Sequence, residues 1–189
     1  MEVAAVYAFK NGTEVINSKY PALLSEVANV INAVDASLCR TKVSKEKKMM
    51  RDVLFDSKEL NKAFKKEFMN QGWQPLQVKC DYPTQYYVEG YKPTDLKNGA
   101  SIEMDLIKSK LGLEVLFGKY SHMMNNVAEK MTIFSSLGHI DAGIEIVPVK
   151  SFTDIMLSNV PSFEQFVWDL EKRGVSNIDV PAMIIGIDK

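Results

Sequence analysis

Three acidic side chains lie in two neighbouring segments that have the pattern of β-strands. Glu103 and Asp105 alternate with apolar residues over 101–107, and Glu114 lies in the apolar run 113–117. Because strand side chains alternate between faces, Glu103 and Asp105 share one face, and pairing of the two strands as a hairpin brings Asp105 towards Glu114. Two carboxylates without a neighbouring His or Cys suit a hard cation such as Mg²⁺, which can polarise a phosphodiester and activate water.

The same acids also have a plainer interpretation as solvent-facing strand residues, because an Asp-x8-Glu pair is a weak pattern. The sequence offers little other catalytic chemistry. It contains no phosphate-binding glycine loop, no dinucleotide-binding glycine pattern and no zinc-ligand spacing. Its two histidines, His122 and His139, have no visible third partner for a nucleophilic triad. A metal-dependent reaction at phosphate is therefore the hypothesis to test against the plainer one.

Positive charge is concentrated in one segment of a chain that is nearly neutral as a whole. Residues 40–51 contain six basic residues and one acidic residue, whereas the formal net charge of the chain is −1. Such a cluster is either the solvated start of a helix or a surface that contacts phosphates. The second interpretation makes Arg40, Lys42 and Lys45 candidate DNA-binding residues.

Length and composition favour one soluble globular domain over residues 1–189. The chain has 46% apolar and 25% charged residues, and no apolar run approaches the roughly 20 residues that cross a bilayer. The N-terminal residues have neither the basic nor the long apolar part of a signal peptide. Two cysteines, Cys39 and Cys80, are too few for a disulfide framework. We therefore expect a cytoplasmic protein with no membrane partner.

The elements that would position the acids follow from hydrophobic periodicity. Apolar runs of strand length occupy 3–9, 101–107, 113–117, 140–149 and 180–187. Helical spacing occupies 20–34, 57–72, 120–134 and 151–173, with Ser57 as an N-cap, Gly72 and Gly174 as stops and an interruption near Pro161. Short strands or loops are expected over 74–97. Helices inserted between buried strands predict an α/β fold whose sheet is covered on its faces.

The stretch GLEVLFGKYSHMMNNVAEKMTIFS over 112–135 resembles the catalytic strand and following helix of type II restriction endonucleases of the BstYI/BglII/BamHI kind. These enzymes belong to the PD-(D/E)xK nuclease superfamily. The GKYS run and the paired Asn125-Asn126 are the specific parts, and further similar stretches follow the same order over 39–49, 57–64, 140–150 and 181–188. The resemblance implies a restriction-endonuclease-like α/β core with a mixed central sheet flanked by helices.

The resemblance also implies a function. It predicts a homodimer that binds a palindromic site in double-stranded DNA, with a GATC core, and cleaves it with Mg²⁺ to leave a 5′ phosphate. Asp105 and Glu114 match the two metal-binding carboxylates of the family, and a main-chain carbonyl at Val115 or Leu116 would complete the ligands. Lys119 and Ser121 fall where the family contacts DNA after the catalytic strand. Ser158 and Asn159 resemble a second base-contacting segment.

One position departs from the family pattern. Leu116 stands two residues after Glu114, where the family carries Gln, Glu or Lys in its third catalytic position. A leucine side chain cannot bind a cation or orient a water molecule. Either another group substitutes, with Glu103, Lys108, Lys110 and Lys119 as candidates, or the chain is a DNA-binding protein that keeps the nuclease fold without cutting. The helix over 120–134, with its methionine stripe at Met123, Met124 and Met131, would serve as core or as the subunit interface.

Overall fold

A six-stranded mixed sheet forms the centre of the protein, which is represented by a computed structural model that describes residues 1–93, 99–157 and 160–189. The strand order is β1-β8-β7-β6-β5-β4. β6, β7 and β8 run parallel to one another, and the remaining neighbours pair antiparallel. The strands are β1 (Glu2–Phe9), β4 (Gln74–Lys79), β5 (Ser101–Lys108), β6 (Leu111–Val115), β7 (Ala142–Pro148) and β8 (Ala182–Asp188). The expected α/β fold with a mixed sheet is confirmed.

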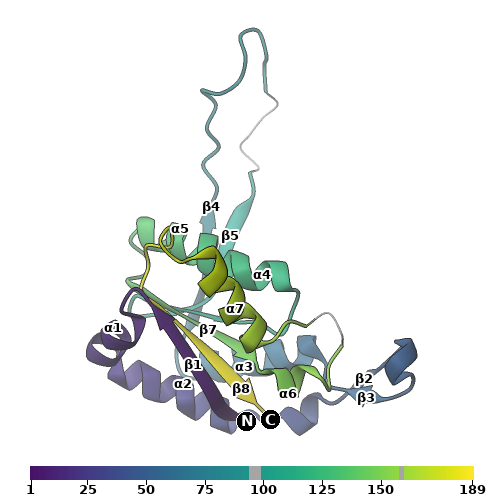
Figure 1. Ribbon diagram of the computed structural model, residues 1–189. Coiled ribbons are helices and arrows are strands. Elements are labelled where there is room, and N and C mark those ends of the chain that lie inside the picture. The colour runs from purple at the N-terminus through teal and green to yellow at the C-terminus, as the bar shows by residue number, and fades with distance from the viewer. Residues whose placement is uncertain (94–98, 158–159) are drawn as a thin grey trace.

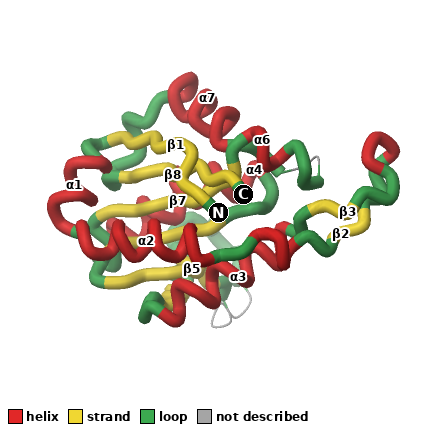
Figure 2. The backbone as a smooth tube through the Cα atoms, turned by 90° about the horizontal axis from the view of Figure 1, so that it is seen from below, coloured by secondary structure: helices red, strands yellow, loops and turns green. Residues whose placement is uncertain are grey.

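Helices cover both faces of this sheet (Figures 1 and 2). One face packs against α2 (Pro21–Ala33) and α3 (Ser57–Asn70), and the other packs against the helical run after β6 and against α7 (Phe163–Arg173). That run consists of α4 (Tyr120–Asn125), a π-helical segment η3 (Asn126–Lys130) and α5 (Met131–Ser136). The remaining helices are α1 (Gly12–Lys19), α6 (Lys150–Thr153) and the short 3-10 turns η1 (Ala36–Cys39) and η2 (Lys47–Met49).

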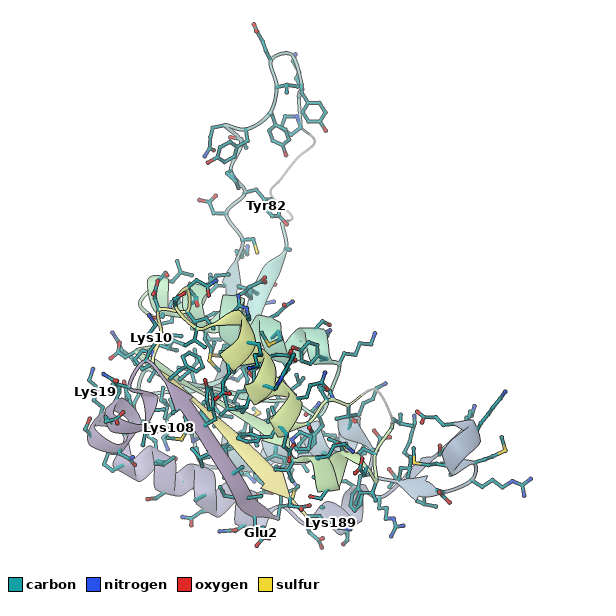
Figure 3. The ribbon with its side chains drawn as sticks, viewed as in Figure 1. Glu2, Lys10, Lys19, Tyr82, Lys108 and Lys189 are labelled. Carbon is teal, nitrogen blue, oxygen red and sulfur yellow. The ribbon has the colours of Figure 1, made fainter. Side chains whose placement is uncertain are left out.

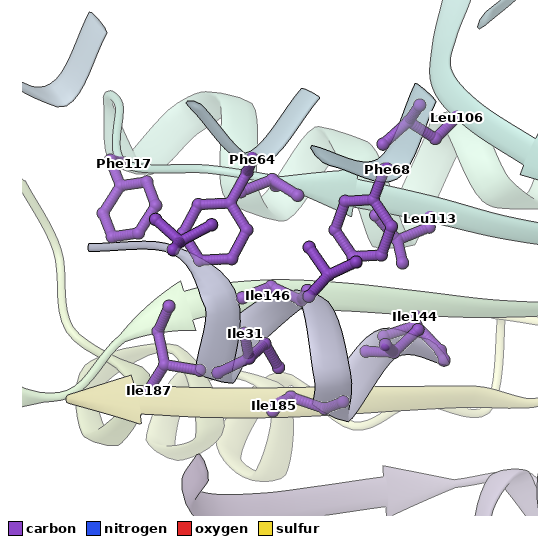
Figure 4. Close-up of a cluster of buried hydrophobic side chains, with 14 of the residues drawn as sticks. Ile31, Phe64, Phe68, Leu106, Leu113, Phe117, Ile144, Ile146, Ile185 and Ile187 are labelled. Carbon is purple, nitrogen blue, oxygen red and sulfur yellow. The ribbon is translucent and has the colours of Figure 1, made fainter. Parts of the chain in front are cut away.

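Aromatic packing fixes α3 on the sheet. Phe64 and Phe68 are fully buried one helical turn apart, with ring centroids 6.4 Å apart, and Phe117 lies 5.7 Å from Phe64 (Figure 4). Burying each of these rings stabilises the fold by about 2–3 kcal/mol. The same helix presents Lys65, next to Phe64 in sequence, towards β5. The core therefore determines where this lysine can lie.

Several boundaries differ from those expected. Asp56, not Ser57, caps α3, because its carboxylate accepts the N–H of Lys58 at 2.8 Å. Gly72, with φ of 86°, and Gly174, with φ of 78°, do end helices as predicted, since both adopt the left-handed backbone region. α1 was not predicted. The expected helix over 151–173 is two helices, of which α7 begins after Ser162, and the predicted helix over 120–134 contains the π-helical segment.

Two further segments project from the sheet. The described part of the connection between β4 and β5, residues 80–93 and 99–100, extends away from the core, and Tyr82 accepts the N–H of Ala100 across it at 2.6 Å (Figures 1 and 3). A small hairpin of β2 (Lys42–Val43) and β3 (Val53–Leu54) projects from a different part of the protein, away from the β4–β5 connection (Figure 1). In the described residues, no helix has the length and hydropathy that crossing a membrane requires.

Candidate active site

β5 and β6 form the hairpin that the acidic residues predicted. The turn is made by Ser109 and Lys110, whose φ values of 49° and 67° belong to the left-handed region that two-residue hairpin turns require. Pairing runs from Lys108 opposite Leu111 to Leu106 opposite Leu113. Beyond that pair the two strands diverge, and the acids lie at this fork.

A β-bulge in β5 causes the divergence. Three steps along β5, from Met104 to Ile107, face only two steps of β4, so β5 carries one extra residue at Asp105 or Leu106. As a result Met104 packs on the α5 side of the sheet, whereas Leu106 packs on the α3 side. The backbone N–H of Asp105 is released from the ladder and donates to Oε1 of Glu114 at 3.1 Å. The predicted approach of Asp105 and Glu114 is thus confirmed, and the bulge is its cause.

The Asp105 carboxylate faces α3 and water. Its side chain is 38% exposed, and Nζ of Lys65 lies 3.9 Å from Oδ1. The same lysine nitrogen lies 3.4 Å from Oε1 of Glu103, so Glu103 and Asp105 do share a face as the strand alternation predicted. These distances and exposures describe a weak, water-screened ion pair that another anion can replace.

Glu114, unlike Asp105, is shielded from water. Its side chain is 2% exposed, and Oε1 accepts a hydrogen bond from Nζ of Lys130 at 3.0 Å. Burial, and secondarily the charge of Asp105, raises the pKa of Glu114 to about 8, while Lys130 acts in the opposite direction. The carboxylate is therefore short of positive charge, and a further cation would stabilise its ionised form.

A second buried acid lies beside Glu114. Glu145 occupies the register position directly opposite Glu114 in the β6–β7 pair and is fully buried. Its Oε1 accepts from Nδ2 of Asn126 at 3.3 Å, and its Oε2 has no hydrogen-bond partner among the residues described. Burial, and then the neighbouring Glu114, raises the pKa of Glu145 well above its usual range. Asn126 and Lys130 are the two ends of η3, so this π-helical turn supplies donors to both acids, as π-helical turns often do at functional sites.

A cleft of about 580 Å³ opens between α3 and the fork. Its walls include Asn61, Lys65, Met69, Asp105, Val115 and Leu116. β6 ends at Val115, so Leu116 lies just beyond the strand rather than within it as predicted. Its side chain is half-buried and packs against the core on the α5 side. The position at which the family carries a polar group is therefore at the wall of the cleft but offers it only hydrocarbon.

The donor set at the fork fits a hard cation in part. Carboxylate oxygens of Asp105 and Glu114 are the ligand type that Mg²⁺ prefers, and the unbalanced charge of Glu114 favours a cation. Within 1–93, 99–157 and 160–189, no three His, Cys, Asp or Glu side chains come together as a metal cluster. An ion held here would thus depend on two carboxylates, the main chain near Val115 and groups from outside the protein, such as water and phosphate.

The predicted DNA-binding residues fall into different surroundings. Lys42 and Lys119 line one smaller cleft of about 240 Å³, next to the end of β6. Lys45 and Ser121 are exposed, on the β2–β3 hairpin and on α4. Arg40 donates through Nε to the carbonyl of Val53 at 2.9 Å, and so helps to hold the base of the hairpin. Ser158 and Asn159 lie outside the described residues.

Four residues of the site were not expected from the sequence. Lys65 and Lys130 come from helices distant in sequence, and no local spacing marks them. Glu145 did carry a signal, because it is the single acid inside the apolar run 142–149. Asn126 was noted only as part of the family resemblance. The substitutes suggested for Leu116 did not include Lys65 or Lys130.

Comparison with known proteins decides the family. The sequence matches the family described as restriction endonuclease BglII/BglIII over residues 4–187. This chain belongs to that family. The family resemblance inferred from the 112–135 stretch is thereby confirmed. No match was found among curated proteins.

Solved structures of the family share the fold. The crystal structure of restriction endonuclease BglII complexed with a DNA 16-mer is similar to this chain with a TM-score of 0.73 and 18% sequence identity, covering 100% of this chain and 77% of BglII. Free BglII gives a TM-score of 0.63 at 18% identity, covering 100% of this chain and 80% of the other. At this identity the likeness concerns the arrangement of the sheet and helices, including the strands that bear the fork.

Proposed function

We propose that this protein is a type II site-specific deoxyribonuclease that hydrolyses phosphodiester bonds in double-stranded DNA with the help of Mg²⁺. The observation that carries the proposal is the contact of Asp105 with Glu114 at the bulged strand fork, where Asp105 opens onto the cleft. Family membership supports it, and BglII itself has been crystallised with DNA. No covalent intermediate with the protein is needed.

The reaction is an in-line hydrolysis at phosphorus. The oxygen of a water molecule bonds to phosphorus, the bond from phosphorus to O3′ breaks, and the products are a 5′ phosphate and a 3′ hydroxyl. One proton leaves the attacking water and one reaches the departing O3′. Mg²⁺, when bound, neutralises phosphate charge and makes the attacking water more acidic.

The protein groups divide the work at the fork. Asp105, Glu114 and the carbonyl of Val115 would hold the ion. The N–H of Asp105 and Nζ of Lys130 both donate to Oε1 of Glu114. Neither of these two hydrogen bonds uses the other carboxylate oxygen, Oε2, which would bind the ion. These donors keep the carboxylate in one orientation before an ion arrives, and such preorganisation is a main source of catalytic rate.

DNA contacts are proposed on the same side as the two clefts. Lys42 and Lys45 of the β2–β3 hairpin would contact phosphates, with Arg40 supporting the hairpin. Lys119 and Ser121 would reach base edges next to the catalytic strand, and Ser158 and Asn159 would form the second reading segment. A palindromic site with a GATC core would match a two-fold homodimer.

The helical run after β6 is the proposed dimer surface. Met123 and Met131 are fully buried in the core, so they cannot serve an interface, and the core interpretation of the methionine stripe holds for them. Ile133 and Leu137 are exposed apolar residues at the end of the same run, 41% and 52% exposed. These two side chains are the ones that a partner subunit would cover.

Plasmid cleavage tests the function. Purified protein is incubated with plasmid DNA in Mg²⁺ or in EDTA, and the ends of any fragments are sequenced. Discrete fragments with a common palindromic sequence and 5′ phosphates are expected in Mg²⁺ only. Asp105→Asn serves as the control for a contaminating nuclease, and fragments that persist with it contradict the proposal.

A second candidate function is sequence-specific DNA binding without cleavage. Leu116 favours it, because its side chain adds no donor or acceptor to the cleft. An electrophoretic mobility shift with plasmid fragments in EDTA detects binding independently of cutting. Shifted discrete fragments without any cleavage in Mg²⁺ would select this candidate over the nuclease.

A further inference from the structure

We propose that Lys65 of α3 is the catalytic cation of this site and contacts the scissile phosphate in place of the polar side chain that Leu116 lacks. The proposal rests on the proposed nuclease function. It adds a residue of helix α3 to a set of proposed catalytic residues that otherwise come from the strands β5 and β6.

Lys65 and Leu116 line the same cleft as Asp105. A phosphate that approaches Asp105 therefore meets both. Leu116 offers it no hydrogen bond, whereas Nζ of Lys65 lies 3.9 Å from Oδ1 of Asp105, beside the carboxylate that the phosphate approaches. Lys62 and Lys66 also line this cleft, but Lys65 is the one of its lysines that is paired with a fork carboxylate.

α3 holds this lysine in register with the end of β6. Asn61, one helical turn before Lys65, accepts the N–H of Phe117 at 3.1 Å. Phe64 is fully buried beside Lys65 and packs on the ring of Phe117. The helix is thus joined to the segment that follows Leu116 by a hydrogen bond and by aromatic packing. The stem of the lysine is positioned, while the side chain as a whole is 39% exposed, which leaves its ammonium group free to move.

The lysines suggested earlier as substitutes have other partners. Lys108 donates to both carboxylate oxygens of Glu26, at 2.9 and 2.7 Å, and to the carbonyl of Gln71. Lys110 lies in the hairpin turn, 4.0 Å from Asp141. Lys119 lines the smaller cleft. None of these three lines the cleft of Asp105.

Lys130 is excluded for a different reason. It contacts the fork from the opposite side of the sheet and is only 19% exposed, with its ammonium bound to Glu114. Releasing it to contact a phosphate would remove its hydrogen bond to the buried Glu114, and leaving a buried polar group without a partner is costly. Lys130 is therefore a positioning residue for Glu114, whereas Lys65 lines the cleft beside Asp105.

The chemical role follows from charge. Without DNA, the ammonium of Lys65 is shared between Glu103 and Asp105. When a phosphate enters, the ammonium donates to a non-bridging oxygen and offsets the negative charge that grows there as water attacks. A preorganised donor to developing charge is typically worth 10²–10³ in rate.

The test compares Lys65→Ala, Lys65→Arg and the matched control Lys19→Ala, which removes an exposed lysine that lies 3.9 Å from Asp141 and lines neither cleft. Single-turnover cleavage of plasmid DNA is measured in Mg²⁺ with enzyme in saturating excess, so that the rate reports the chemical step and not affinity. Lys65→Ala should lose at least 100-fold, Lys65→Arg should regain at least tenfold, and Lys19→Ala should stay within threefold. Thermal unfolding verifies that each variant folds.

The outcomes separate this proposal from the nuclease proposal. If the unaltered chain cuts and Lys65→Ala cuts within threefold of it, the role of Lys65 is overturned while the nuclease function stands. If the unaltered chain does not cut, the nuclease function fails, and the salt dependence of duplex binding in Ca²⁺ then decides the phosphate contact. Lys65→Ala should reduce the log–log slope by about 0.9, as expected for one phosphate contact, and an unchanged slope overturns the contact too.

Discussion

Two lysine–carboxylate pairs lie at the same strand fork, on opposite sides of the sheet, and differ chiefly in their access to water. Lys130 and Glu114 are 3.0 Å apart, with side chains 19% and 2% exposed. Lys65 and Asp105 are 3.9 Å apart, with side chains 39% and 38% exposed. Burial makes the first pair a fixed part of the fold, whereas water leaves the second free to exchange partners. We infer that the buried pair keeps Glu114 in place, whereas the exposed pair is the one that meets the substrate.

The largest expected effect comes from the exposed pair. Asp105→Asn removes the carboxylate that faces the cleft while keeping its shape, and it should reduce single-turnover cleavage in Mg²⁺ by at least 10³-fold, or about 4 kcal/mol. Unfolding in urea should change by less than about 1 kcal/mol, because the lost ion pair is exposed. If Asp105→Asn instead unfolded at a lower urea concentration and cut DNA at the normal rate, Asp105 would be a residue for stability and not for catalysis.

The buried pair should dominate stability instead. At pH 9, above the pKa of about 8 of Glu114, Lys130→Met keeps most of the side-chain volume but leaves the ionised Glu114 without its cation, so the free energy of unfolding should fall by about 3 kcal/mol. Lys65→Met is the matched substitution in the exposed pair and should cost less than about 1 kcal/mol. Urea denaturation of both variants in EDTA measures the difference, and equal losses would remove the contrast between the pairs.

A pH dependence should come from the buried side alone. The pKa of Glu114 is raised from 4.5 to about 8 in the folded, metal-free protein, so the folded state binds this proton more tightly than the unfolded chain. Its contribution to stability is fully present below the unfolded pKa and is lost as pH rises through about 8. Between pH 5.5 and 8 we expect Glu114→Gln to remove about 3 kcal/mol of that decline. Parallel stability curves for the two proteins over this range would argue against it.

The smallest effect concerns Leu116. Leu116→Gln places a polar group on the cleft wall and should raise single-turnover cleavage at least tenfold, about 1.4 kcal/mol. The gain should be larger in a Lys65→Ala background, where the cleft lacks its cation. No gain in either background would mean that position 116 does not act on the reacting phosphate in this chain.

The sequence was sufficient to predict that Asp105 and Glu114 approach each other, but not to predict the bulge or the lysines around them. Alternation and the short connection at Lys110 were enough to pair β5 with β6 and so to bring Asp105 near Glu114. The bulge could not be predicted, because nothing in the sequence around Asp105 indicates an extra residue in the strand. Lys65 and Lys130 escaped for a related reason. Their contacts arise from how helices pack on the sheet, and tertiary packing leaves no fixed spacing in the sequence.

The burial of Glu145 was within reach. An acid in the middle of a continuous apolar strand has to be neutralised or paired, and that argument applies to the sequence alone. Ser57 failed as a cap because Asp56 precedes it, and a carboxylate competes well for the same N–H groups. The π-helical turn was invisible, since its stripe of apolar residues fits an ordinary helix nearly as well.

The position of β8 has a consequence for how the chain folds. β8 is the last strand in sequence, yet it lies inside the sheet between β7 and β1. A nascent chain that has not yet released residues 182–188 from the ribosome has β1 without β8, its neighbour in the described part of the sheet, and β7 with an open edge, so these contacts of long sequence separation form after those of the other five strands. The fork of β5 and β6 thus becomes part of a completed sheet only after residues 182–188 have been synthesised and released.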